Sequence, residues 1–117
     1  MILDLGESLL VVHRRLFEGD QGRFFVGKVE DYEGGIARVT GYSFARDPND
    51  GNYARKEERH TRLFAIASGT LLAYVIPADV VVDRVKIEAR ETGLCLTDGG
   101  SYSMNVSEWI HVASASM

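Results

Sequence analysis

Residues 23–46 read RFFVGKVEDYEGGIARVTGYSFAR, and this stretch decides the fold class. Two runs rich in aromatic and β-branched residues flank the pair Gly34-Gly35. Two-residue hairpin loops need positive φ angles, which glycine adopts without steric cost, and their twist matches that of the flanking strands. The stretch therefore predicts a long antiparallel β-hairpin that turns at the two glycines.

The predicted loop fixes which residues of the two strands lie opposite each other. Asp31 then faces Arg38 as an opposite-charge pair, and Phe25 faces Phe44 as an aromatic pair. Cross-strand pairs of both kinds are favourable, which supports this register. We expect the side that carries Phe25, Tyr42 and Phe44 to face the core.

The flanking segments repeat the pattern of short strands and tight turns. Residues 8–17 alternate poorly and carry basic residues on both faces, which is typical of a strand at an edge or a barrel mouth. Residues 61–76 contain two apolar runs around Ser68-Gly69 and predict a second hairpin. Both faces of this second hairpin are apolar, so we expect the long loop, the terminal segment or a second subunit to cover it.

The C-terminal half continues with shorter strands. Pro77 ends the preceding strand because proline has no N–H for the ladder. Residues 82–91 alternate cleanly between apolar and charged side chains and predict a strand that faces inward through its apolar positions. A three-residue turn at 98–100 places Leu96 opposite Tyr102, which keeps apolar side chains together.

Two segments leave alternatives open. Residues 47–60, DPNDGNYARKEERH, form the long connection, and they are either a short helix or a mobile loop. Residues 107–112 form either a short helix or a last strand, and 113–117 form a frayed tail. The whole pattern predicts a mainly β, single domain over 1–117, an antiparallel meander of about eight strands that closes as a small barrel or folds as a sandwich.

Composition bounds the function. The 117 residues carry a net charge of −4 and are 45% hydrophobic, which is typical of a globular domain. An acidic chain is a poor match for nucleic acid, because phosphate binding draws on surplus lysine and arginine. The N-terminal segment does not resemble a signal peptide, and no apolar stretch is long enough to span a bilayer. The single cysteine, Cys95, cannot form an internal disulfide, so we expect a soluble cytoplasmic protein without membrane contact.

Basic residues converge at the open end of the predicted hairpin. Arg23 faces Arg46 there, and His13 and Arg15 of the preceding strand are expected near by. Opposed like charges cost free energy, so either the strands splay, acidic neighbours pair with the arginines, or an anionic ligand binds. The candidate ligand-binding residues are His13, Arg15, Arg23, Arg46 and His60.

The sequence predicts no catalytic residue, metal site or cofactor. Glu57 with His60, and Glu108 with His111, share the Glu-x-x-His spacing of di-iron bundles. That chemistry needs further carboxylates inside a four-helix bundle, which this β-rich chain does not offer. Cys95 has no evident base or feature that lowers the thiol pKa, so it is interpreted as a packing residue.

Three functional hypotheses follow. The first is a non-catalytic binding domain that binds either itself, as a homo-oligomer through the hairpin at 61–76, or a partner. The second is an anionic small-molecule site or enzymatic pocket at the barrel mouth, beneath residues 47–60. The third is weak binding of single-stranded nucleic acid. The basic residues at the open end of the hairpin would join Arg55, Lys56, Arg59 and Arg62 in one patch, with Phe24 as a stacking ring.

Overall fold

The computed structural model describes residues 3–14, 23–46, 53–91 and 93–106. Its larger sheet contains β1 (Ser8–His13), β2 (Arg23–Glu33), β3 (Ile36–Arg46), β4 (Tyr53–Arg55), β5 (His60–Ala65) and β6 (Leu71–Ile76). Its smaller sheet contains β7 (Lys86–Arg90), β8 (Gly93–Thr97) and β9 (Ser103–Asn105). Short 3-10 turns lie at η1 (Ile66–Ser68) and η2 (Val82–Arg84). The prediction of a mainly β, antiparallel protein is confirmed.

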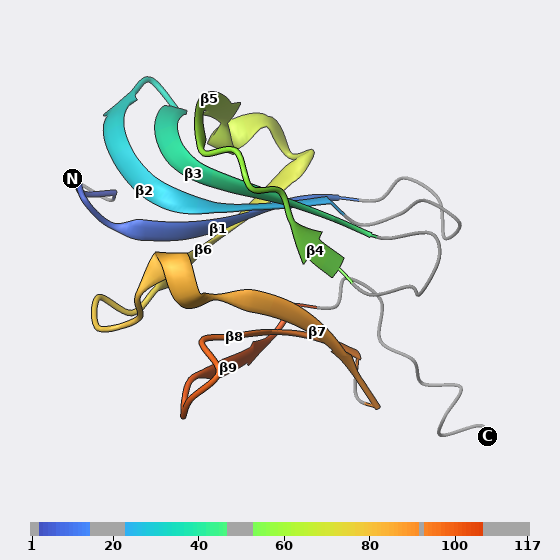
Figure 1. Cartoon of the computed structure of the whole chain (residues 1–117). Helices are drawn as coiled ribbons and strands as arrows, with labels where there is room; N and C mark the ends of the chain where they lie inside the picture. Colours follow the sequence, from blue (N-terminus) through green and yellow to red (C-terminus); the bar gives the residue numbers. More distant parts are fainter. Residues whose placement is uncertain (1–2, 15–22, 47–52, 92, 107–117) are drawn as a thin grey trace.

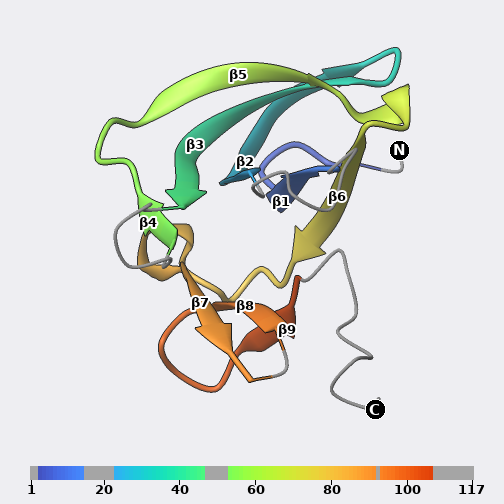
Figure 2. The same ribbon diagram turned by 90° about the vertical axis from the view of Figure 1, so that its right-hand side faces the viewer.

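The strands of the larger sheet follow the order β4, β3, β2, β1, β6, and β5 also pairs with β3. Every strand pair described is antiparallel. Figure 2 shows this sheet curling from β5 through β3, β2 and β1 to β6. Within the described strands neither sheet closes into a barrel.

The hairpin of β2 and β3 turns at the predicted glycines, with φ values of 56° at Gly34 and 82° at Gly35. Asp31 lies opposite Arg38, as predicted, and their charged groups are 3.8 Å apart. The predicted register fails beyond this point, because an irregularity between Val29 and Asp31 shifts the pairing by one residue. Such a bulge gives one strand an extra residue that has no partner.

The shifted register pairs Phe24 with Phe44, so the predicted pairing of Phe25 with Phe44 is wrong. Phe25 lies opposite Ser43, and Tyr42 lies opposite Val26. Phe25 and Phe44 are both buried, but they belong to different hydrophobic clusters on opposite faces of the sheet. The hairpin therefore has two core-facing sides instead of one.

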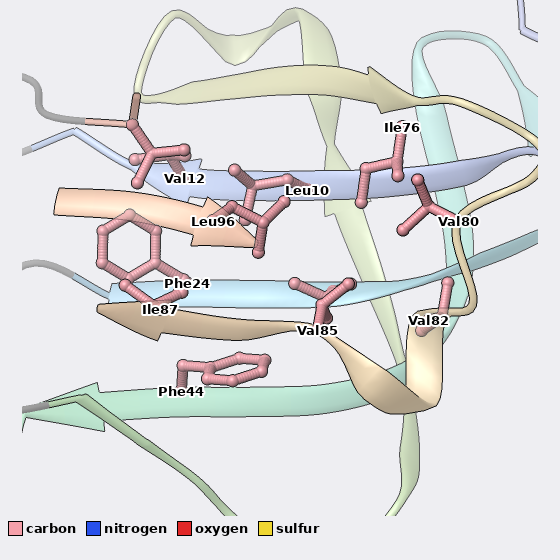
Figure 3. Packing of buried hydrophobic residues seen from close by; sticks show 12 residues of the cluster. Leu10, Val12, Phe24, Phe44, Ile76, Val80, Val82, Val85, Ile87 and Leu96 are labelled. Atoms are coloured by element: carbon pink, nitrogen blue, oxygen red, sulfur yellow. The ribbon is translucent and has the colours of Figure 1, made fainter. Parts of the chain in front are cut away.

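The first cluster, which we call the inter-sheet cluster, fills the space between the two sheets (Figure 3). Its buried members from the larger sheet are Leu10, Val12, Phe24, Val26, Phe44 and Ile76. Val80, Val82, Val85, Ile87, Leu96 and Val106 meet them from the C-terminal half. The apolar alternation in 82–91 thus predicted Val85 and Ile87 correctly, whereas Ala89 is exposed.

The second cluster, the inner cluster, lies on the other face of the larger sheet. Its buried members are Leu3, Leu9, Val11, Phe25, Val29, Ala37, Val39 and Phe64. Strand β1 contributes alternately to both clusters and pairs with β2 and β6, so it is a central strand. The prediction of an edge strand in this segment is wrong, because the basic residues of 8–17 all follow the buried run SLLVV.

Residues 61–76 do not form the predicted hairpin. Strand β5 pairs with β3, strand β6 pairs with β1, and η1 separates them (Figure 1). A local turn is present, since Gly69 has a φ of 83°, but it redirects the chain to a different neighbour. The end of β6 at Ile76, just before Pro77, agrees with the prediction.

Three further predictions meet the structure differently. Residues 53–60 are not helical: they contain β4 and the first residue of β5. Leu96 lies opposite Met104 instead of Tyr102, because the turn is longer than three residues. The Thr97 hydroxyl donates to the Tyr102 carbonyl at 2.8 Å and accepts from the Gly99 N–H, which stabilises the longer turn. Residues 107–117 lie outside the described residues.

Gly27 of β2 lies opposite Gly41 of β3. The two strands curve together (Figure 1). A Cβ built on Gly41 would overlap the Val26 carbonyl oxygen and come within 2.5 Å of the Gly27 Cα. A Cβ on Gly27 would likewise overlap the Thr40 carbonyl. Neither position needs a positive φ, so close approach of the two backbones is the reason for glycine here.

Gly41→Ala is expected to lower the free energy of unfolding by about 1–3 kcal/mol, because the added methyl group would overlap the backbones of both strands. Urea denaturation measures the loss. Gly100→Ala is the control, since its Cβ would meet only the Asp98 side chain at 3.4 Å. Equal stability of the two variants would contradict the close-approach interpretation.

Leu96→Ala is expected to cost about 2–5 kcal/mol, because Leu96 is fully buried between the two sheets. Leu63→Ala is a matched control on an exposed leucine, at 67% exposure, and should change stability by less than about 0.5 kcal/mol. Thermal and urea unfolding measure both. A small effect at Leu96 would show that the smaller sheet contributes little to the core.

Candidate binding sites

The structure brings two of the predicted basic residues directly together. His13 ends β1 and pairs with Arg23, the first residue of β2. His13 is half-buried and Arg23 is exposed. His60 begins β5, Arg46 ends β3, and Arg15 lies outside the described residues.

His13 and His60 contact one pair of aromatic rings in the inner cluster. The His13 ring lies edge-on to Phe64 at 6.2 Å between centroids, and the His60 ring lies edge-on to Phe25 at 5.5 Å. The Phe25 and Phe64 rings are themselves 5.1 Å apart. His13 and His60 therefore stand at the same end of the inner cluster.

Arg62 joins this group, and it is not among the predicted site residues. Its guanidinium lies over the Phe25 ring at 5.7 Å from the centroid. Strand alternation places His60, Arg62 and Phe64 on one face of β5, and this spacing was visible in the sequence HTRLF. We call His13, Arg23, His60 and Arg62 the basic cluster.

Arg46 lies apart from the basic cluster. It pairs with Tyr53 of β4, whose ring packs edge-on against Phe24 at 5.3 Å. Alternation along β3 places Arg46 on the same face as Phe44, which belongs to the inter-sheet cluster. The predicted site is thus partly assembled: His13, Arg23 and His60 come together, and Arg46 does not.

The hydrogen bonds of His60 define its neutral tautomer. Its Nδ1 lies 3.2 Å from the Glu58 carbonyl oxygen, which can only accept, so Nδ1 carries the proton. Its Nε2 then accepts from the Ser43 hydroxyl at 3.3 Å. The imidazole is positioned by two partners and by the Phe25 ring.

Burial lowers the pKa of His13 below its usual value of 6.5, and the positive charges of Arg23 and Arg62 lower it further. The folded protein therefore holds His13 as a neutral imidazole at neutral pH. In the unfolded chain the pKa returns to its usual value, so the unfolded state binds more protons below pH 6.5. The stability that follows from the lowered pKa is fully present above pH 6.5, and it is lost as the pH falls from 6.5 through the lower pKa of the folded state.

His13→Gln is expected to reduce the loss of stability on acidification, because glutamine does not titrate. Urea unfolding at about pH 7.5 and about pH 5.5 brackets the histidine transition and measures the change. Arg62→Gln should reduce the same loss more weakly, since it removes only one of the neighbouring charges. An unchanged pH dependence in His13→Gln would contradict this assignment.

A groove of about 370 Å³ lies elsewhere, between the β2–β3 hairpin and the segment that follows β6. Its lining residues are Lys28, Thr40, Gly41, Tyr42, Arg59, Ala78, Val80, Val81, Val82 and Asp83. Arg55 stabilises one wall: its guanidinium lies 4.4 Å from the Tyr42 ring centroid and donates to the Asp83 carbonyl at 2.7 Å. The sequence did not indicate this groove, because the parts that form it, the β2–β3 hairpin, Arg59 and the segment after β6, are far apart along the chain.

Strand β6 is the last strand of the larger sheet and pairs only with β1 among the described strands. Leu72 and Val75 are 36% and 55% exposed. The Arg14 N–H donates to the Thr70 carbonyl, so alternate residues from Thr70 onward direct their backbone groups toward β1. The intervening residues, Leu71, Ala73 and Val75, direct theirs to the open edge.

In the ranges that the structure describes, no three histidine, cysteine, aspartate or glutamate side chains form a group able to hold a metal ion. The same ranges contain no helix that is long and apolar enough to cross a membrane. The free cysteine, Cys95, is buried in β8. Comparison with known protein families, curated proteins and solved structures gave no match.

Proposed function

We propose that this protein is a non-catalytic binding domain that forms a symmetric homodimer by antiparallel pairing of β6 with β6 of a second copy. The observation that carries the proposal is the apolar edge of β6, which no described strand covers, with exposed Leu72 and Val75. An unpaired edge presents backbone donors and acceptors that a further strand can satisfy. A dimer would extend the larger sheet across two molecules.

The residue content of the edges supports β6 over the alternatives. Its sequence, LLAYVI, has no charged residue and no proline. Natural proteins protect exposed edges with charges, and the other described edge strands longer than three residues carry them: Arg62 in β5, and Lys86, Glu88 and Arg90 in β7. Strand β6 lacks this protection.

The open backbone groups of β6 fit a two-fold arrangement. Leu71, Ala73 and Val75 are spaced two apart, so a two-fold axis through Ala73 pairs Leu71 with Val75 of the second copy in both directions. Ala73 then pairs with its own counterpart. This symmetry keeps equivalent faces of the two sheets on the same side, as a self-complementary interface requires.

The proposal modifies the prediction of self-association through 61–76. Only the second half of that segment takes part, because β5 pairs with β3. The surface involved is a strand edge instead of a two-faced hairpin. Barrel closure and a cytoplasmic location stay predictions, and the unpaired Cys95 supports the latter.

Val75→Lys is expected to convert a dimer into a monomer at micromolar concentration, because it places charges beside the shared edge. Sedimentation equilibrium measures the mass. Val81→Lys is the matched control: Val81 is 51% exposed and lies outside β6, so this variant should remain dimeric. A monomeric unmodified protein, or equal dissociation of both variants, would refute the proposed dimer.

The proposed register of β6 against β6 of the second copy can be tested separately, by disulfide cross-linking. The two Ala73 Cα atoms would be about 5.5 Å apart in a hydrogen-bonded antiparallel pair, which is a distance that a disulfide spans. Ala73→Cys should therefore form a covalent dimer on mild oxidation, whereas Val81→Cys should not. Failure of Ala73→Cys to cross-link in a protein that sediments as a dimer would exclude this register.

A further inference from the structure

The groove beside the β2–β3 hairpin is lined by two cationic side chains that have no partner among the described residues. The side chains of Lys28 and Arg59 make no hydrogen bond or ion pair in the described part of the chain. They reach the groove from different elements, Lys28 from β2 and Arg59 from the connection before β5. Two cations that line one concave surface, and that form no ion pair with a described residue, favour an anion there.

The other polar groups of the groove leave this positive charge in excess. The Thr40 hydroxyl, which carries no charge, is hydrogen-bonded to the Thr61 hydroxyl at 2.6 Å. The guanidinium of Arg55, behind Tyr42, adds a third positive charge near by. Asp83 is the one carboxylate among the lining residues.

The size of the groove limits the ligand. About 370 Å³ lies at the lower end of the range for small-molecule sites, which is roughly 300–1,000 Å³. Ala78 and residues 80–83 line it on the side opposite the hairpin, and Val80 and Val82 among them are buried. A metabolite-sized molecule fits this volume better than a polymer.

We propose that this groove binds a small hydroxylated oxyanion, with Lys28 and Arg59 holding the anionic group and the Asp83 carboxylate accepting hydrogen bonds from the hydroxyl groups. Arginine offers a planar pair of donors that matches the two oxygens of a carboxylate or phosphate, and lysine adds a point charge. The shared chemistry is an oxyanion at one end and a polyol at the other. The site is separate from β6 and from the basic cluster.

The test uses the full chain and three probes: ribose 5-phosphate, gluconate and uncharged ribose. Amide shifts in an NMR titration at low ionic strength should identify residues around 28, 40–42, 59 and 78–83 for both anions, and ribose should leave them unchanged. The tighter-binding anion shows whether phosphate or carboxylate is preferred. No saturable shift with either anion at millimolar concentration would overturn the proposal.

Variants assign the contacts. Lys28→Gln and Arg59→Gln should each weaken binding of the preferred anion by about tenfold or more, as expected for loss of a charge-assisted hydrogen bond. Lys56→Gln is the control, because Lys56 is exposed and does not line the groove. Equal affinity in Lys28→Gln, Arg59→Gln and Lys56→Gln would overturn the assignment of the anion to this groove.

Two further measurements test whether Asp83 binds the hydroxyl groups of the ligand, and whether the ligand is a small molecule. Asp83→Asn should weaken ribose 5-phosphate more than inorganic phosphate, and equal changes would remove the polyol contact. A short oligonucleotide that competes more tightly than ribose 5-phosphate would overturn the small-molecule class. Val75→Lys should bind the anions like the unmodified protein, so the fate of this site is distinguishable from that of the β6 dimer.

Discussion

Burial of β1 on both faces is the constraint on which the rest of the structure depends. A strand that is apolar on alternate and intervening positions needs a hydrophobic layer on each side. Leu10 and Val12 meet the smaller sheet, while Leu9 and Val11 meet residues that the curvature of the larger sheet brings across. The smaller sheet therefore covers one face of β1, and the curved larger sheet itself covers the other.

The curvature in turn depends on the β2–β3 hairpin. Two features act on it: the irregularity beside Asp31, which resets the pairing, and the backbone contact of Gly27 with Gly41. Because Gly27 and Gly41 have no side chains, the two strands approach closely there and bend together. The bend carries β5 and its Phe64 over the inner cluster, and with them the histidine contacts described above.

Local signals in the sequence predicted local structure well. The Gly34-Gly35 turn, the Asp31–Arg38 pair and the strand end at Ile76 follow from residue preferences that act over a few positions. The bulge was missed because counting from a turn assumes uninterrupted pairing. The partners of β5 and β6 were missed because both apolar runs suit any neighbour, and only the three-dimensional packing selects β3 and β1. The candidate sites divide in the same way: His13 and Arg23 are close because adjacent strands place them so, whereas the groove needs three remote segments.

Arg55 has a consequence for how the protein unfolds. It sits on β4, a strand of three residues, yet its guanidinium stacks on Tyr42 of β3 and donates to the backbone of Asp83, just before β7. Displacement of Tyr42 or of Asp83 would therefore remove one of the two contacts of the Arg55 guanidinium. The side chain thus links β3 and β4 of the larger sheet to η2, so that displacement of η2 removes one of the two partners of Arg55.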